Sequence, residues 1–70
     1  MIRTTRLQRE ALLRVYRRTM QETRHRMTQQ QYMQFSYRAF RRTVQPGPGC
    51  IMVPFAGMWL GIEPDGYTHS

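Results

Sequence analysis

The run Gln45-Pro46-Gly47-Pro48-Gly49 constrains the fold of this 70-residue chain more than any other feature. Two prolines and two glycines within five residues remove a backbone donor at each proline and restore backbone freedom at each glycine, so no helix continues through the run. The run therefore divides the chain into two parts, residues 1–45 and residues 46–70.

The two parts differ in charge. All 11 basic residues are arginines within residues 1–45. The charged residues of 46–70 are two acids, Glu63 and Asp65. This asymmetry predicts an anionic partner for the first part and a packing role for the second. Arginine without lysine favours bidentate contacts to carboxylate or phosphate, although a GC-rich genome would give the same composition without selection on chemistry.

A first helix is predicted from about Thr5 to Arg26. Thr5 followed three residues later by Gln8 fits a capping box at its start. At about 100° per residue the apolar side chains form one broad face, and an arginine strip fills the other.

A second helix is predicted from Gln29 to about Val44. Thr28 and Gln31 form a second capping box, and Met27 and Tyr32 flank it as a hydrophobic staple. The short connection between the two helices predicts an antiparallel hairpin.

Residues 46–70 are expected to be an irregular, extended apolar tail. The apolar stretch from Cys50 to Ile62 is interrupted by Pro54, Gly57 and Gly61, and Glu63-Pro64-Asp65-Gly66 predicts a turn. The fold class predicted is therefore mainly α: a basic two-helix hairpin over residues 1–45, followed by a Pro/Gly-broken apolar tail over residues 46–70. A chain this short with one cysteine cannot rely on disulfides, so we expect no stable fold without a partner surface.

The sequence favours a binding role over catalysis. It has no paired carboxylates, no nucleophile with a base, no phosphate loop and no metal-ligand spacing, so we expect neither enzymatic activity nor a cofactor of its own. The longest apolar stretch has 13 residues, fewer than the roughly 20 that a membrane-spanning helix needs. The rings on the two helices share their apolar sides, which favours a core role over base stacking and leaves phosphate contacts to the outer arginines.

Three segments resemble the mitochondrial LYR-motif (complex I LYR-like) family, in a shortened form without a clear third helix. They are the run from Ala11 to Arg18, then Met20 and Glu22, and the run from Tyr37 to Arg42. Tyr16 and Arg17 match the last two positions of the Leu-Tyr-Arg motif, with Val15 in place of leucine, and Phe40 matches the downstream phenylalanine in its basic setting.

The resemblance implies a non-catalytic accessory subunit of a mitochondrial respiratory-chain or ATP-synthase complex, in the matrix or on the matrix side of the inner membrane. It also implies docking of an acyl carrier protein, whose phosphopantetheine-linked acyl chain enters the helical core in the family. The alternative is a mitochondrial ribosomal protein that binds rRNA through its arginines. The motif and the arginine pattern together give nine candidate partner-binding residues: Arg14, Val15, Tyr16, Arg17, Arg18, Arg38, Phe40, Arg41 and Arg42.

Overall fold

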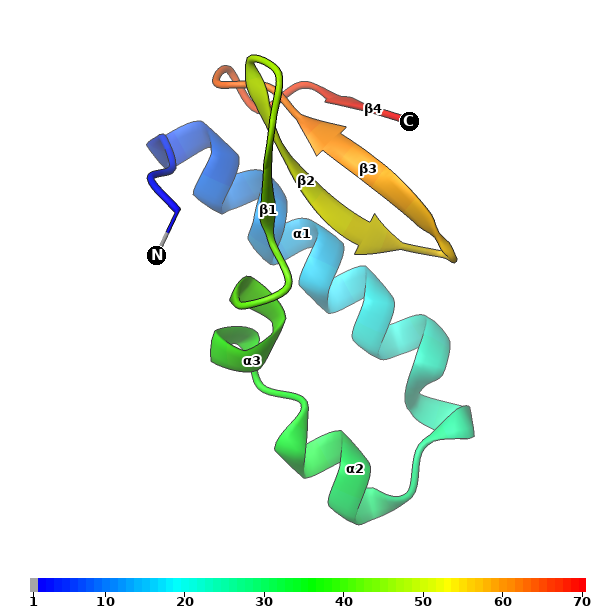
Figure 1. The fold of residues 1–70 in the computed structure, drawn as a ribbon. Coiled ribbons are helices and arrows are strands. Elements are labelled where there is room, and N and C mark those ends of the chain that lie inside the picture. Colours follow the sequence, from blue (N-terminus) through cyan, green and yellow to red (C-terminus); the bar gives the residue numbers. More distant parts are fainter. Residues whose placement is uncertain (1) are drawn as a thin grey trace.

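The protein has an α+β fold in the computed structural model, which describes residues 2–70. A helical part comes first and a four-stranded antiparallel sheet follows it (Figure 1). The elements in chain order are α1 (Arg6–Thr23), the 3-10 turn η1 (Arg24–Arg26), α2 (Gln29–Gln34), α3 (Tyr37–Arg41), β1 (Gln45–Gly47), β2 (Cys50–Phe55), β3 (Met58–Ile62) and β4 (Thr68–His69). The predicted fold class, a helical hairpin with an irregular tail, is therefore wrong.

The first helix is confirmed and begins at its predicted capping box. The Thr5 hydroxyl accepts a hydrogen bond from the Gln8 backbone amide at 3.1 Å, and the Gln8 side chain accepts one from the Thr5 amide at 2.9 Å. These two bonds satisfy backbone donors that the first turn of a helix leaves free. The regular helix ends at Thr23, and η1 continues the chain to Arg26.

The second helix begins where predicted but is broken into two short helices. Thr28 and Gln31 form the expected capping box at the start of α2. Phe35 then leaves helical geometry, with φ −86° and ψ 71°, and the Ser36 hydroxyl accepts a hydrogen bond from the Ala39 amide at 3.1 Å to cap α3. A serine side chain competes for backbone bonds in this way, which favours a new helix start over continuation of the old one.

The predicted irregular tail is a sheet because its apolar residues alternate. Ile51 and Val53 on β2 are buried, and their partners across the hairpin are Ile62 and Leu60 on β3. Alternation with a period of two places these side chains on one face of the sheet. The β2–β3 turn consists of Ala56 (φ 53°) and Gly57 (φ 77°), and two consecutive positive φ values are typical of a tight type I′ hairpin.

Pro54 lies within a strand because one side of that strand is an edge at this position. The pairing of β1 with β2 ends at Met52, so Pro54 has a strand neighbour only in β3, opposite Trp59. Proline is tolerated where its missing donor would face away from the ladder.

The core lies between α1, α3 and the inner face of the sheet, and Figure 1 shows the sheet crossing the N-terminal part of α1. Its buried members come from both halves of the chain: Ala11, Leu12, Val15, Phe40, Val44, Ile51, Val53 and Ile62. Two hydrogen bonds fix the start of α1 to the sheet side, one from the buried Gln8 Nε2 to the Ile62 carbonyl (3.1 Å) and one from the Thr5 hydroxyl to the Pro64 carbonyl (2.6 Å). The apolar face of α1 is thus covered by the sheet as well as by α3.

Candidate binding surface

The three motif residues with apolar side chains lie inside the molecule. Phe40 is 2% exposed, Val15 is buried beside it in the core, and Tyr16 is partly buried against the same cluster. The ring centroids of Tyr16 and Phe40 are 5.5 Å apart. Burial on this scale makes Phe40 and Val15 structural, and together with Tyr16 they fill the space between α1 and α3 with side chains.

Tyr16 also organises the neighbouring aromatic residues. Its hydroxyl donates a hydrogen bond to the Phe35 carbonyl at 3.0 Å, and its ring stacks on Phe35 at 6.1 Å and meets Tyr37 edge-on at 5.5 Å. Phe35 is the residue at which the second helix breaks, so this bond satisfies a carbonyl next to the break. The cluster therefore fixes the position of the α2–α3 connection against α1.

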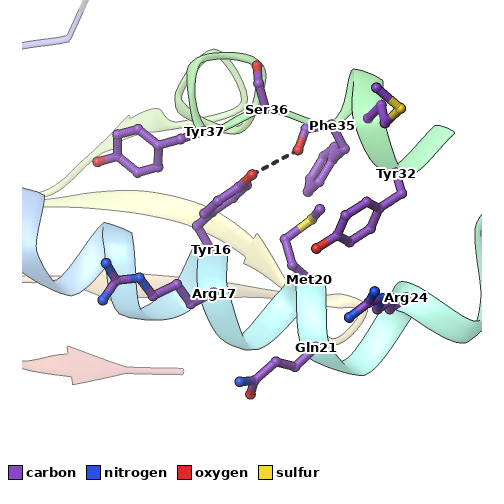
Figure 2. A pocket seen from close by; sticks show the side chains of 10 residues that line it. Tyr16, Arg17, Met20, Gln21, Arg24, Tyr32, Phe35, Ser36 and Tyr37 are labelled. Atoms are coloured by element: carbon purple, nitrogen blue, oxygen red, sulfur yellow. Dashed lines mark hydrogen bonds between the residues drawn. The ribbon is translucent and has the colours of Figure 1, made fainter. Parts of the chain in front are cut away.

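A first groove, here called the aromatic groove, opens between the C-terminal part of α1 and the α2–α3 segment (Figure 2). It encloses about 570 Å³. Figure 2 shows Tyr16 and Met20 extending from α1 toward the α2–α3 segment, whereas the Gln21 side chain lies on the opposite side of α1. The full lining is Tyr16, Arg17, Met20, Gln21, Arg24, Tyr32, Met33, Phe35, Ser36 and Tyr37.

A second groove, here called the arginine groove, lies between the N-terminal segment, α3 and the start of β1. It encloses about 790 Å³. Three of its eight lining residues are arginines, and most of the others are apolar. The full lining is Ile2, Tyr37, Arg38, Arg41, Arg42, Val44, Gln45 and Pro46. The groove thus combines a cationic rim with an apolar floor.

Tyr37 belongs to both grooves and separates them. The Arg41 guanidinium carbon lies 6.0 Å from the centroid of the Tyr37 ring, and Arg41 Nη2 donates a hydrogen bond to the Thr4 hydroxyl at 3.3 Å. These contacts hold Arg41 in place, while Arg38 and Arg42 are exposed. One fixed and two free guanidinium groups therefore face the arginine groove.

No acidic residue lines either groove. The two ion pairs found within residues 2–70 lie on α1, Arg6 with Glu10 at 4.0 Å and Arg18 with Glu22 at 3.1 Å, and both are largely exposed. Exposed pairs of this kind contribute little to stability. The arginines that line the grooves therefore keep their charge available to an anionic partner.

The nine predicted residues do not form one site. Arg38, Arg41 and Arg42 share the arginine groove, Arg17 lines the aromatic groove, and the three apolar motif residues are in or against the core. Of the other two, Arg14 is exposed on α1 outside both grooves and Arg18 is paired with Glu22.

Sequence reasoning missed the residues that make the two grooves concave. Val44 and Pro46 form part of the arginine groove's floor, yet they were assigned to a helix end and a breaker. The break at Ser36, which opens the aromatic groove, had a visible signal: a serine three residues before Ala39, within the expected helix.

The described part of the chain contains no group of three or more His, Cys, Asp or Glu residues that could hold a metal ion. Cys50 is a free, partly buried thiol. None of the helices described between residues 2 and 70 is long and apolar enough to cross a membrane.

Comparison with known proteins identified no relative: no family model, no curated protein and no solved structure matches this chain.

Proposed function

We propose that this protein is a non-catalytic accessory subunit that binds an acidic segment of a partner protein in its arginine groove. One observation carries the proposal: three arginines and several apolar residues line the same groove, and no acid lies among the lining residues. A partner that fits this groove carries carboxylates and apolar side chains on the same segment.

The spacing of the arginines supports this partner class. Arg38, Arg41 and Arg42 are three and four residues apart, so they project from one side of α3 and its end. A guanidinium group offers forked donors that match a carboxylate, and such charge-assisted bonds are stronger than neutral ones. The floor formed by Ile2, Val44 and Pro46 would bury apolar side chains of the partner, which a phosphate backbone does not supply.

The resemblance to the LYR-motif family suggests which proteins could carry this acidic segment. It suggests an acyl carrier protein, or an acidic subunit of a mitochondrial respiratory-chain or ATP-synthase complex, on the matrix side of the inner membrane. Tyr16 and Phe40 occupy the space between α1 and α3, where an acyl chain would have to enter. We therefore propose docking of the carrier's acidic surface without insertion of its acyl chain.

Two double variants that remove equal charge test the proposal. Titration of the full chain against acyl carrier protein should show a loss of at least about tenfold for Arg38→Gln/Arg42→Gln, because each bond to a charged group contributes about 1.5–3 kcal/mol. The control Arg14→Gln/Arg26→Gln removes two exposed arginines that line neither groove, and it should cost less than about threefold. Equal losses of affinity for the two double variants would show that the binding is general charge attraction and does not depend on the arginine groove.

The second candidate is an rRNA-binding subunit of the mitochondrial ribosome. The observation that favours it is the exposure of arginines outside the arginine groove, at Arg3, Arg6, Arg9, Arg14 and Arg26. A protein that contacts phosphates at many points binds with a steep salt dependence. Sedimentation of a mitochondrial extract separates the two candidates, since co-migration with the ribosome favours the second and co-migration with an inner-membrane complex favours the first.

A further inference from the structure

The aromatic groove has open ring surface as well as charge. Tyr16, Tyr32, Phe35 and Tyr37 line the groove and are each partly buried, so each keeps some surface accessible to a ligand. The contacts of Tyr16 with Phe35 and Tyr37 hold three of the rings in fixed positions. At about 570 Å³ the groove is within the size range of ligand sites.

The two cations of the groove come from one continuous helical run, Arg17 from α1 and Arg24 from the first position of η1. Arg17 and Arg24 are seven residues apart, which places their backbones about 10 Å apart along the helix axis. The Arg24 guanidinium carbon lies 5.3 Å from the centroid of the Tyr32 ring, within cation–π distance. This contact keeps Arg24 at the groove, where guanidinium and ring together offer a stacking surface.

We propose that the aromatic groove binds single-stranded nucleic acid, with bases against its rings and successive phosphates on Arg17 and Arg24. Partly exposed rings suit planar bases, and the lining contains no acid that would repel a phosphate. Because the backbones of the two arginines are about 10 Å apart along the helix axis, a strand that runs along the helix can place one phosphate near each of them.

This site is distinct from the one proposed for the acidic partner. The two grooves share only Tyr37, and the arginine groove offers aliphatic floor residues where the aromatic groove offers rings. Either site can therefore fail without the other.

Fluorescence anisotropy with a short labelled oligouridylate tests the inference on the full chain. Tyr32→Ala should weaken binding roughly 5- to 150-fold, the range for loss of one stacked base, while Tyr32→Phe should retain it. Arg17→Gln/Arg24→Gln should reduce the slope of log affinity against log salt by about 1.4, since each phosphate contact on a single strand contributes about 0.7. The matched control is Arg38→Gln/Arg42→Gln, which removes the same charge from the other groove and should leave the effect of Tyr32→Ala unchanged. Circular dichroism of each variant verifies that it is folded.

Three results would overturn the inference. The first is an equal loss of affinity and of salt-dependence slope for the two double arginine variants, which would show that binding depends on total charge and not on the aromatic groove. The second is oligouridylate affinity that is unchanged in Tyr32→Ala. The third is a free uridine monophosphate that binds as tightly as the strand, or an acidic peptide whose binding depends on Arg17 and Arg24, because either would assign the groove to another ligand.

Discussion

The two capping boxes of this protein provide an internal comparison for the most specific prediction of the fold. Gln8 and Gln31 make the same pair of bonds with their capping threonines. Gln8 is 4% exposed and also donates its Nε2 to the Ile62 carbonyl at 3.1 Å, whereas Gln31 is exposed. Replacing each glutamine by glutamate keeps the capping oxygen and removes the amide donor, so the two sites differ in the bond to the sheet and in burial.

The two substitutions should differ sharply at neutral pH. Gln31→Glu should be neutral or slightly stabilising, because a carboxylate at this position completes a capping box and interacts favourably with the helix N-terminus. Gln8→Glu buries a carboxylate against the Ile62 carbonyl, and we estimate a loss of about 2–3 kcal/mol from the removed bond and the unpaired charge. In a domain of this size that loss lowers Tm by roughly 10–20 °C.

Thermal unfolding followed by circular dichroism measures both variants. Burial raises the pKa of the carboxyl group in folded Gln8→Glu above its ordinary value of about 4.3, so below about pH 4 the group is protonated in both the folded and the unfolded state. It can then donate to Ile62 again, and the difference between the two variants should shrink. The folded state of Gln8→Glu is thus more stable at low pH, and its loss of stability relative to Gln31→Glu appears as the pH rises and the carboxyl group ionises. Equal Tm values for Gln8→Glu and Gln31→Glu at pH 7 would refute the docking of α1 on the sheet.

Four further substitutions test separate parts of the structure by the same assay. Gly66→Ala should cost about 1–3 kcal/mol, because Gly66 has φ +89° and its added Cβ would lie 3.1 Å from a backbone oxygen. Ser36→Ala should cost about 1 kcal/mol through loss of the α3 cap, and no loss would contradict the break between α2 and α3. Phe40→Ala should cost about 3–5 kcal/mol, whereas Tyr16→Phe, which loses only the bond to the Phe35 carbonyl, should cost about 1 kcal/mol. A folded Phe40→Ala variant with reduced partner binding would instead make Phe40 a contact residue.

The local features of the fold were predictable because they depend on neighbouring residues. Both capping boxes lie at the predicted threonines, and the turn at Glu63–Gly66 is confirmed by the bond from the Gly66 amide to the Glu63 carbonyl at 2.8 Å. Each of these features is complete within four residues. No distant part of the chain is needed to decide them.

The sheet was missed because prolines and glycines were interpreted only as breakers. Pro54 is acceptable at an edge position, and Gly57 forms a hairpin turn, so both are compatible with strands. The alternation of Ile51, Val53 and Phe55 was present in the sequence and is the pattern of a half-buried strand. Whether such a strand has partners depends on long-range pairing, which local patterns do not specify.

The correction also changes what is expected of the chain alone. The prediction of no stable fold without a partner rested on the short chain, the lack of disulfides and an apolar tail with nothing to cover it. Ile51, Val53 and Ile62 of that segment are in the core with residues of α1 and are at most 4% exposed, so the last of these three reasons no longer holds. The dependence on a partner now rests on the two grooves.

The candidate site was predictable in its charge and not in its shape. The arginines near the end of the second predicted helix do line one groove, as Arg38, Arg41 and Arg42. Their floor is made by Ile2 and Pro46, which are 44 positions apart and meet only when the sheet folds back. A sequence pattern on one helix cannot predict that two such distant residues line the same groove.

Site-specific photo-crosslinking in cells tests the central claim most directly, because it assumes no identity for the partner. Gln45 is exposed and lines the arginine groove, so a photoreactive residue there reports on the groove without removing an arginine. Gln30, exposed on α2 and outside both grooves, is the matched control. We predict an adduct from position 45, absent from position 30, with a protein segment rich in acidic and apolar residues. Adducts with RNA at position 45, or the same products from both positions, would contradict the account.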